Sequence, residues 1–164
     1  MNSTAKQKQP RQRGGFTALL ATMTCGAIND NLLRGALLLS VVDRGLWADA
    51  LGAGGTGWIT VMLYLPFILL LGVTGQLADR FSKRTIIVWT LCIEVVLAAG
   101  VTAGFWWQDL WVVCGFFILL AAQSAFFSPA KYGAVPELVP DDQLSRANGL
   151  LSLLTNSAII TGVA

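Results

Sequence analysis

Long apolar runs separated by short polar connections dominate the chain. Two of these runs, 57–77 and 85–107, are each long enough to cross a bilayer, since a membrane-spanning helix needs roughly 20 apolar residues. The segment 75–84 connects them and is strongly charged, and such a turn cannot lie in hydrocarbon. The pattern therefore predicts two antiparallel transmembrane helices, with the segment 75–84 at a membrane face.

The same pattern predicts an all-α membrane protein with four complete spans and a truncated fifth. The predicted spans are 16–42, 57–77, 85–107, 110–138 and 144–164. The fifth breaks off at Ala164 without a polar flank, so we expect the chain to be the N-terminal part of a longer polypeptide. The fourth is longer than the bilayer core is thick, so its helix should tilt, kink at Pro129 or project into the cytosol.

Charged residues are few, and their positions predict an orientation. The chain is 55% hydrophobic and 12% charged, against roughly 25% charged in an average soluble domain. The net charge of +2 and the clustering of the basic residues give no indication of a nucleic-acid partner. One side of the predicted bundle carries Lys6, Lys8, Arg11, Arg13, Arg80, Lys83, Arg84 and Arg146, and the other carries Arg44. The positive-inside rule then makes residues 1–15 a cytoplasmic basic tail, with Trp106, Trp107 and Trp111 at the outer interface.

Soluble-type catalytic and metal sites are not indicated. The chain has no histidine, which removes Ser/His/Asp and Cys/His arrangements and the histidine base of glycerolipid acyltransferases. The three cysteines lie in apolar runs and form no CxxC motif, so neither a disulfide framework nor a zinc site is indicated. The sequence therefore predicts a protein that is not an enzyme and has no metal or cofactor.

Ionisable side chains inside the first predicted span are candidates for a substrate site. Asp30 and Arg34 lie near its middle, flanked by Asn29 and Asn31, and a charge at that depth costs roughly 2.5 to 3.5 kcal/mol on insertion scales. Their i, i+4 spacing also allows an internal ion pair that only makes insertion tolerable. Both interpretations stand, and Asp30, Asn31 and Arg34 are the substrate-binding candidates.

Two further ionisable residues lie in the third and fourth predicted spans. Lys131 is either a substrate-binding residue or a lysine whose ammonium reaches the headgroups. Glu94 either pairs with a basic residue of another helix or accepts a coupling proton. Gly100 and Gly104 form a GxxxG motif, which predicts a packing face for another helix of the bundle.

The segment Gly75–Arg84 resembles the signature between the second and third helices of the major facilitator superfamily. Ser82 stands where that family usually has glycine. The resemblance implies a conformational latch between two halves of a transporter, made by Asp79 with Gly75, Arg80, Lys83 and Arg84. A cytoplasmic anchor that only sets topology is the alternative.

Shorter segments, 27–31, 126–138 and 147–149, are similar to the lysophospholipid transporter branch of that superfamily. The resemblance implies transport of a lipid-like small molecule across the bacterial inner membrane, sometimes by the leading part of a fusion with acyltransferase and acyl-carrier-protein synthetase domains. It also implies that the first and fourth helices line the substrate path. Asp30 can then take the ammonium of a phosphoethanolamine headgroup, and Lys131 or Arg34 its phosphate.

Two alternatives to a lysophospholipid transporter follow from the same residues. One is a general exporter of small amphipathic compounds, which shares the signature loop but need not use Asp30 and Lys131 as a headgroup pair. The other is the membrane module of a phospholipid-remodelling enzyme whose catalytic domain lies beyond Ala164.

Overall fold

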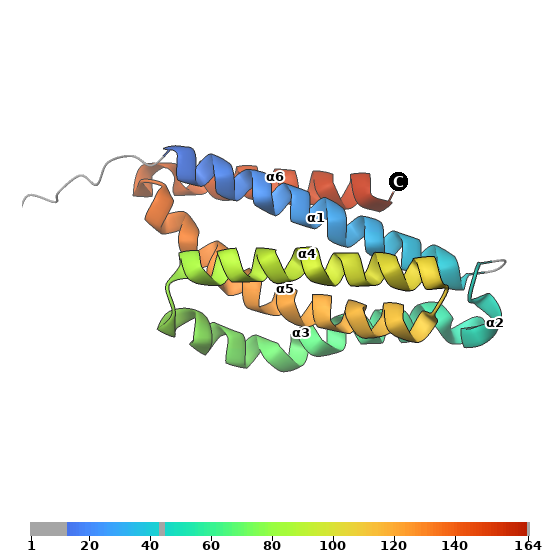
Figure 1. Cartoon of the computed structure of the whole chain (residues 1–164). Helices are drawn as coiled ribbons and strands as arrows, with labels where there is room; N and C mark the ends of the chain where they lie inside the picture. The colour runs from blue at the N-terminus through green and yellow to red at the C-terminus, as the bar shows by residue number, and fades with distance from the viewer. Residues whose placement is uncertain (1–12, 43–44, 164) are drawn as a thin grey trace, which may run out of the picture.

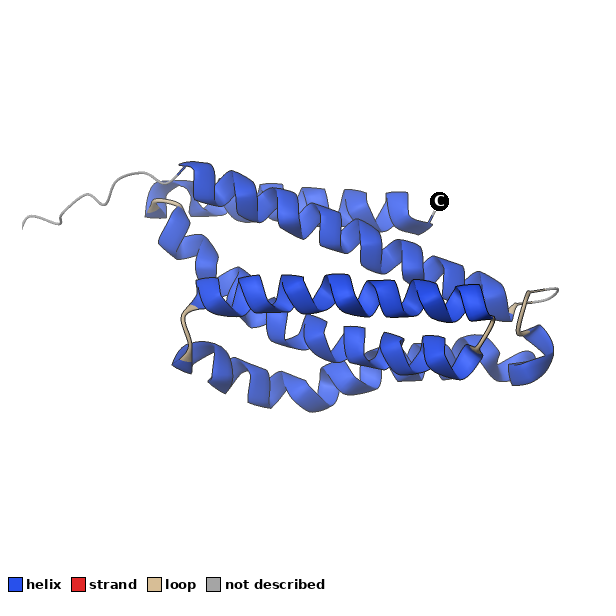
Figure 2. Ribbon diagram, viewed as in Figure 1, coloured by secondary structure: helices blue, strands red, loops and turns tan. Residues whose placement is uncertain are grey.

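The computed structural model describes residues 13–42 and 45–163, and in this part of the chain every regular element is a helix (Figures 1 and 2). The α-helices are α1 (Arg13–Val41), α2 (Ala48–Leu51), α3 (Gly55–Arg80), α4 (Lys83–Trp107), α5 (Leu110–Leu138) and α6 (Leu144–Val163). Short 3-10 turns at Gly52–Gly54 and Asp141–Gln143 precede α3 and α6. The predicted all-α class is confirmed.

Three helices of the described part are long and apolar enough to cross a membrane. They are α3 over Gly55–Gln76, α4 and α5. The helices α1 and α6, although predicted as spans, do not belong to this set. Both carry polar residues in their middle parts, among them Asp30 and Arg34 in α1 and Asn156 in α6. The number of helices that cross the bilayer therefore stays a prediction.

The long helices run back and forth along one axis (Figure 1). The start of α1, the turn between α3 and α4, and the turn between α5 and α6 all lie at the same end of the bundle. Helix α5 packs against α4 and α3, whereas α6 packs along α1. Most of the predicted basic tail lies outside the described residues, as does Arg44.

Two separate apolar clusters hold the helices together. The Trp47 cluster lies toward the α4–α5 turn and contains Leu37, Val41, Trp47, Ile59, Val101, Leu110, Val113, Cys114 and Phe117. The Met23 cluster lies toward the α5–α6 turn and contains Leu19, Leu20, Met23, Ala134, Val135, Ala147 and Leu151. Helices α1 and α5 contribute to both clusters, so the polar middle part of α1 lies between them.

Small residues let α4 and α5 approach closely. A Cβ atom added at Gly100 would lie 2.5 Å from the Phe116 ring, and one added at Gly104 would lie 2.7 Å from Cγ2 of Val113. A side chain at either position would therefore collide with α5. The predicted packing role of this GxxxG motif is confirmed, and α5 is the helix that it contacts.

The segment Gly75–Arg84, called here the signature segment, is mostly helical. Helix α3 continues to Arg80 and α4 begins at Lys83, so only Phe81 and Ser82 form the turn. Ser82 is the N-cap of α4, with a φ of −63°, and its Oγ accepts a hydrogen bond from the Thr85 amide at 3.2 Å. Because this φ is negative, the position does not need the glycine that the family usually has there.

Helix α5 continues through Pro129 and Pro136 and ends at Leu138. In Figure 1 its C-terminal part turns toward the start of α6. A proline inside a helix removes a backbone hydrogen bond and pushes against the preceding turn, which bends the helix. The bend brings Ala134 and Val135 into the Met23 cluster, beside the first turns of α1 and α6.

Candidate functional site

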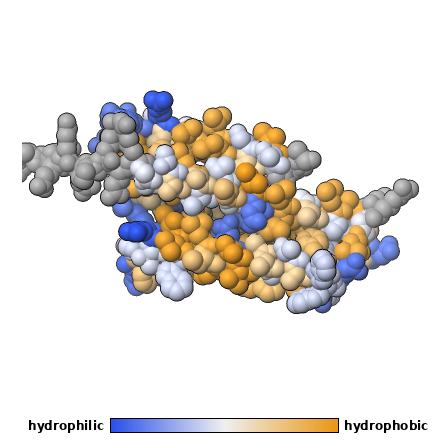
Figure 3. Space-filling view, turned by 45° about the horizontal axis from the view of Figure 1, so that its top comes forward, coloured by the Kyte–Doolittle hydropathy of each residue, from blue (hydrophilic) through white to orange (hydrophobic). Residues whose placement is uncertain are grey.

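A layer of polar side chains lies between the two apolar clusters, where α1 faces α4 and α5. In Figure 3 hydrophilic surface is visible in the middle of an otherwise largely apolar face, as well as at the ends of the bundle. The Ser124 hydroxyl of α5 donates a hydrogen bond of 3.5 Å to Oδ2 of Asp30 on α1. The other carboxylate oxygen, Oδ1, is buried and has no hydrogen-bond partner in the described part of the chain. Asp30 thus keeps an unused acceptor in the bundle interior.

Gln123 connects α5 to α4 at the same level. Its side chain is buried, and Nε2 donates a hydrogen bond of 2.9 Å to the backbone carbonyl of Thr90. The Ser124 hydroxyl also lies 3.4 Å from Oε1 of Gln123. A chain of polar contacts therefore runs from Asp30 through Ser124 and Gln123 to α4. Gln123 and Ser124 were not among the site residues predicted from the sequence, although two adjacent polar residues in an apolar span are the kind of signal that identifies such a contact.

Glu94 reaches from α4 to α1. Its Oε1 lies 3.0 Å from the position of a Cβ atom on Gly26, so the absent side chain of this glycine makes room for the carboxylate. The Gln123 amide is within reach of Glu94, and Glu94 lies close enough to Asp30 for their charges to interact. Among the described residues Glu94 has no basic side chain within 4 Å. The ion pair between Glu94 and a basic residue of another helix, which the sequence allowed, is therefore absent from the described part of the chain.

Arg34 and Asn31 do not point at Asp30. The Arg34 guanidinium lies over the ring of Tyr64 on α3, 5.5 Å from its centroid, and its Nε is buried without a described partner. No ion pair joins Asp30 to Arg34, both of which are described, so the internal pair that the i, i+4 spacing allows does not form. The two side chains face different helices, α5 and α3. Asn31 donates through Nδ2 to the Ala27 carbonyl of its own helix at 2.7 Å.

Lys131 is partly buried near the bend of α5. Its ammonium lies 5.0 Å from the centre of the Tyr132 ring and 6.0 Å from that of Phe127, distances at which a cation is attracted to an aromatic face. It lies close enough to Asp30 for their charges to interact, but no ion pair joins these two described residues. The helical rise puts Lys131 about 10 Å along α5 from Ser124. The structure thus brings Asp30 and Lys131 to one region without pairing them.

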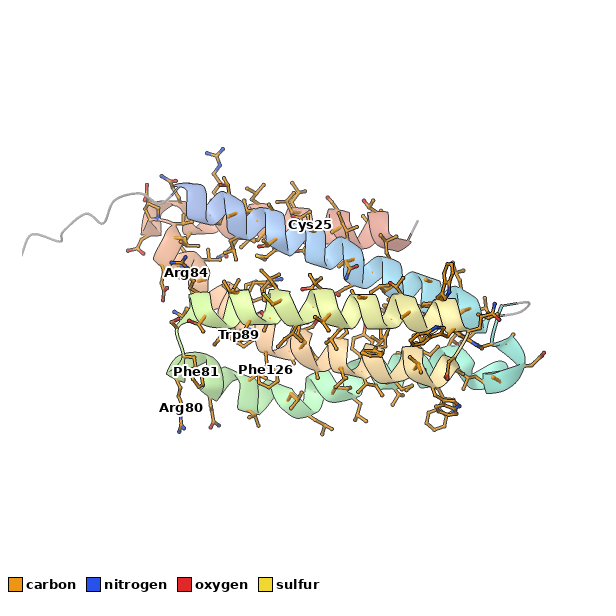
Figure 4. The ribbon with its side chains drawn as sticks, in the orientation of Figure 1. Cys25, Arg80, Phe81, Arg84, Trp89 and Phe126 are labelled. Carbon is orange, nitrogen blue, oxygen red and sulfur yellow. The ribbon has the colours of Figure 1, made fainter. Side chains whose placement is uncertain are left out.

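The predicted latch residues lie where α3 ends and α4 begins. Lys83 pairs with Glu137 of α5 through an Nζ to Oε1 contact of 2.6 Å, and its stem lies against Gly133 one turn earlier. Arg80 and Arg84 are exposed at this end of the bundle (Figure 4). Space is open around Gly75. The side chain of Asp79 lies outside the described residues.

The contact between Lys83 and Glu137 predicts an electrostatic coupling that a charge swap should restore. Lys83→Glu alone should weaken the attachment of the α3–α4 turn to α5, and adding Glu137→Lys should recover most of the loss. Because both side chains are partly exposed, we expect a coupling of at most about 1 kcal/mol. A double-mutant cycle on the free energy of unfolding in detergent measures it. Additive effects of the two substitutions would show that the pair contributes nothing.

No metal centre is found in the described part of the chain. Within residues 13–42 and 45–163 no three His, Cys, Asp or Glu side chains gather as metal ligands. The small apolar gap between Leu37, Ile59 and Phe117 has no polar lining, and it lies within the Trp47 cluster rather than at the polar layer. The polar layer of α1, α4 and α5 is therefore the strongest candidate site.

Comparison with known proteins gives the family. A family model described as Major Facilitator Superfamily matches residues 13–164. The chain belongs to this superfamily. Among curated relatives, a lysophospholipid transporter of Photorhabdus laumondii is 30% identical over 94% of this chain and 36% of its own length. A lysophospholipid transporter of Escherichia fergusonii is 34% identical over 90% of this chain and 34% of its own length. No solved structure matches.

The superfamily also includes a relative with no stated substrate. An uncharacterised transporter of this type from Bacillus subtilis is 32% identical over 94% of the chain and 35% of its own length. The chain thus spans about a third of the length of the curated relatives it matches. Superfamily membership and three long apolar helices make it part of a multi-pass membrane protein. The relatives carry the names of transporters, in agreement with the prediction that this chain is not an enzyme.

Proposed function

We propose that the protein is a secondary transporter that moves lysophospholipids across the bacterial inner membrane by alternating access. The observation that carries this proposal is the unpaired Asp30 carboxylate in the bundle interior, with a buried oxygen that has no described partner. A charge at this depth is costly, so a ligand that compensates it is a physical reason for its presence. The lysophospholipid transporters among the relatives support the same substrate class.

The separation of Asp30 and Lys131 suits a zwitterionic headgroup. A lysophosphatidylethanolamine headgroup carries an ammonium and a phosphate, and charge-assisted contacts to both are strong when water is excluded. Asp30 is the proposed partner of the ammonium, and Lys131 that of the phosphate. Their charges interact but form no ion pair, which leaves both free for a ligand. Arg34, with its guanidinium over Tyr64, is a second candidate for the phosphate, and Asn31 completes the proposed binding set.

The orientation belongs to the same proposal. Arg80, Lys83, Arg84 and Arg146 lie at the end of the bundle where α1 begins. Trp106, Trp107 and Trp111 are exposed at the α4–α5 turn, which is the opposite end. This distribution supports a cytoplasmic N-terminus. Transport would proceed by rocking this bundle against a second one, with the segment Gly75–Arg84, and Asp79 above all, as the latch between them.

A general exporter of amphipathic cations is the second candidate. The uncharacterised relative from Bacillus subtilis is as similar to this chain as the lysophospholipid transporters are. A buried carboxylate and nearby aromatic rings would also attract an organic cation that has no phosphate. In that case Asp30 would bind substrate and Lys131 would not.

Transport by the intact gene product in proteoliposomes distinguishes the two candidates. We expect lysophosphatidylethanolamine to cross the membrane at least about tenfold faster than in empty liposomes, and a lipophilic cation without phosphate to cross at the background rate. Lys131→Met should then reduce lysolipid transport. Transport of the cation alone, unaffected by Lys131→Met, would favour the exporter. Sequencing the gene past Ala164 tests separately the alternative that a catalytic domain follows this membrane module.

A further inference from the structure

The contact between Glu94 and Gly26 brings a second carboxylate to the candidate substrate site. Gly26 and Asp30 are one turn apart on α1 and therefore share a face. Side chains on a helix point toward its N-terminus, so the Asp30 carboxylate leans from its own position toward the level of Gly26. Glu94 lies against Gly26 at that level. The two acids thus come from different helices but face the same small volume.

Few other charges of the described residues face this pair. Helix α1 adds Arg34, but its guanidinium is held over Tyr64 of α3. Helix α5 adds Lys131, which interacts with Asp30 over a distance but forms no ion pair with either acid among the described residues. The described part of α6, which packs along α1, has Arg146 as its ionisable residue, and that side chain is exposed at the end of the bundle. Within residues 13–42 and 45–163, no cation therefore neutralises both acids at contact distance.

Two carboxylates that lie near each other, away from water, do not both ionise without a large cost in free energy. Burial disfavours each charge, and the second negative charge disfavours the first. A single proton on the pair removes the repulsion and leaves one negative charge, which Lys131 attracts from a distance. Gln123, whose amide is held by the Thr90 carbonyl, lies within reach of Glu94.

We propose that Asp30 and Glu94 together hold one proton in the empty transporter, and that a cationic headgroup binding at Asp30 displaces this proton. The inference rests on the proposed function and adds a mechanism of ion exchange to it. The O–H bond of the pair breaks, the proton passes to water, and the ammonium of the substrate takes its place. The two carboxylates and the cation bound to them keep a net charge of −1, because one proton leaves as one ammonium arrives, and the phosphate of the same lipid faces Lys131. Glu94 acts here as a positioning residue that controls the charge on Asp30.

Calorimetry of the intact gene product in detergent tests the exchange. Lysophosphatidylethanolamine is titrated at neutral pH in two buffers that differ in their heat of protonation, which gives the number of protons released per lipid bound. For the wild type we expect about one proton to be released for each lysophosphatidylethanolamine bound. Binding of lysophosphatidylglycerol, which has no ammonium, should release no proton from the protein. Glu94→Gln should bind lysophosphatidylethanolamine without releasing a proton, and its affinity should no longer change with pH.

Gly26→Ala tests the same contact without removing an acid. The added methyl carbon would lie 3.0 Å from Oε1 of Glu94 and should push this carboxylate away from Asp30. We expect a clear reduction in the number of protons released. Gly115→Ala on α5, where the space is open, is the matched glycine control, and Asp49→Asn, at an exposed position of α2, is the matched acid control. Both should behave as the wild type.

The outcomes separate this inference from the proposed function. If the wild type binds lysophosphatidylethanolamine without releasing a proton, or if Glu94→Gln releases as many protons as the wild type, the exchange is wrong and the function stands. If neither lipid binds the wild type, the proposed function itself is wrong. If Glu94→Gln does not fold, the number of protons released by Gly26→Ala is the test. A number equal to that released by Gly115→Ala would overturn the inference.

Discussion

Asp30→Asn should reduce the transport of lysophosphatidylethanolamine more than any other single substitution in this chain. The asparagine has nearly the same shape and can still accept the hydrogen bond of Ser124, so the helices should pack as before. It cannot attract the substrate ammonium. Removing one partner of a buried charge pair costs about 2–5 kcal/mol, which corresponds to a loss of more than tenfold and up to several thousandfold. The initial rate of lysolipid transport in proteoliposomes measures it.

The control for this experiment is a carboxylate outside the bundle interior. Asp49→Asn changes the same functional group at an exposed position of α2 and should leave the rate within about twofold of the wild type. The melting temperature of Asp30→Asn in detergent should equal or exceed that of the wild type, since a buried negative charge without an ion-pair partner among the described residues is removed. An unchanged transport rate in Asp30→Asn and in the double variant Asp30→Asn/Lys131→Met would rule out the headgroup model.

Gly104→Val should have the largest effect on stability. A Cβ atom at this position would lie 2.7 Å from Cγ2 of Val113 and 3.0 Å from its backbone nitrogen, and a backbone atom cannot move aside as a flexible side chain can. Overpacking of this kind typically costs about 1–3 kcal/mol, and we expect the upper end of that range because α4 and α5 would have to separate. The free energy of unfolding in detergent, followed by the loss of helical signal, measures it.

Gly115→Val distinguishes a local collision from a general effect of valine in a membrane helix. Gly115 is exposed on α5, and a Cβ atom added there meets nothing within 4 Å. The substitution has the same chemistry and should change the free energy of unfolding by less than about 0.5 kcal/mol. Equal losses in the two variants would mean that the close approach of α4 and α5 contributes little to stability.

Much of the fold was predictable because membrane helices leave a local signal. A run of apolar residues predicts a helix wherever the backbone must satisfy its own hydrogen bonds, and α5 has the bounds that its apolar run suggested. The extent of the α3–α4 connection was less predictable. Charged residues end a span but not a helix, so α3 continues to Arg80, beyond the point where its apolar run ends. In the same way, the polar residues of α1 interrupt its apolar pattern without ending the helix.

The sequence by itself determined the superfamily, the all-α architecture and the identity of the ionisable residues inside the bundle, because each of these depends on local composition or on a contiguous motif. Only the tertiary structure decided which of those residues face one another. The i, i+4 spacing of Asp30 and Arg34 allowed an ion pair, but contacts with different helices, α5 through Ser124 and α3 through Tyr64, keep the two apart. The approach of Glu94 to Gly26 depends on how α4 crosses α1, and no spacing along one chain segment encodes the packing of two distant helices.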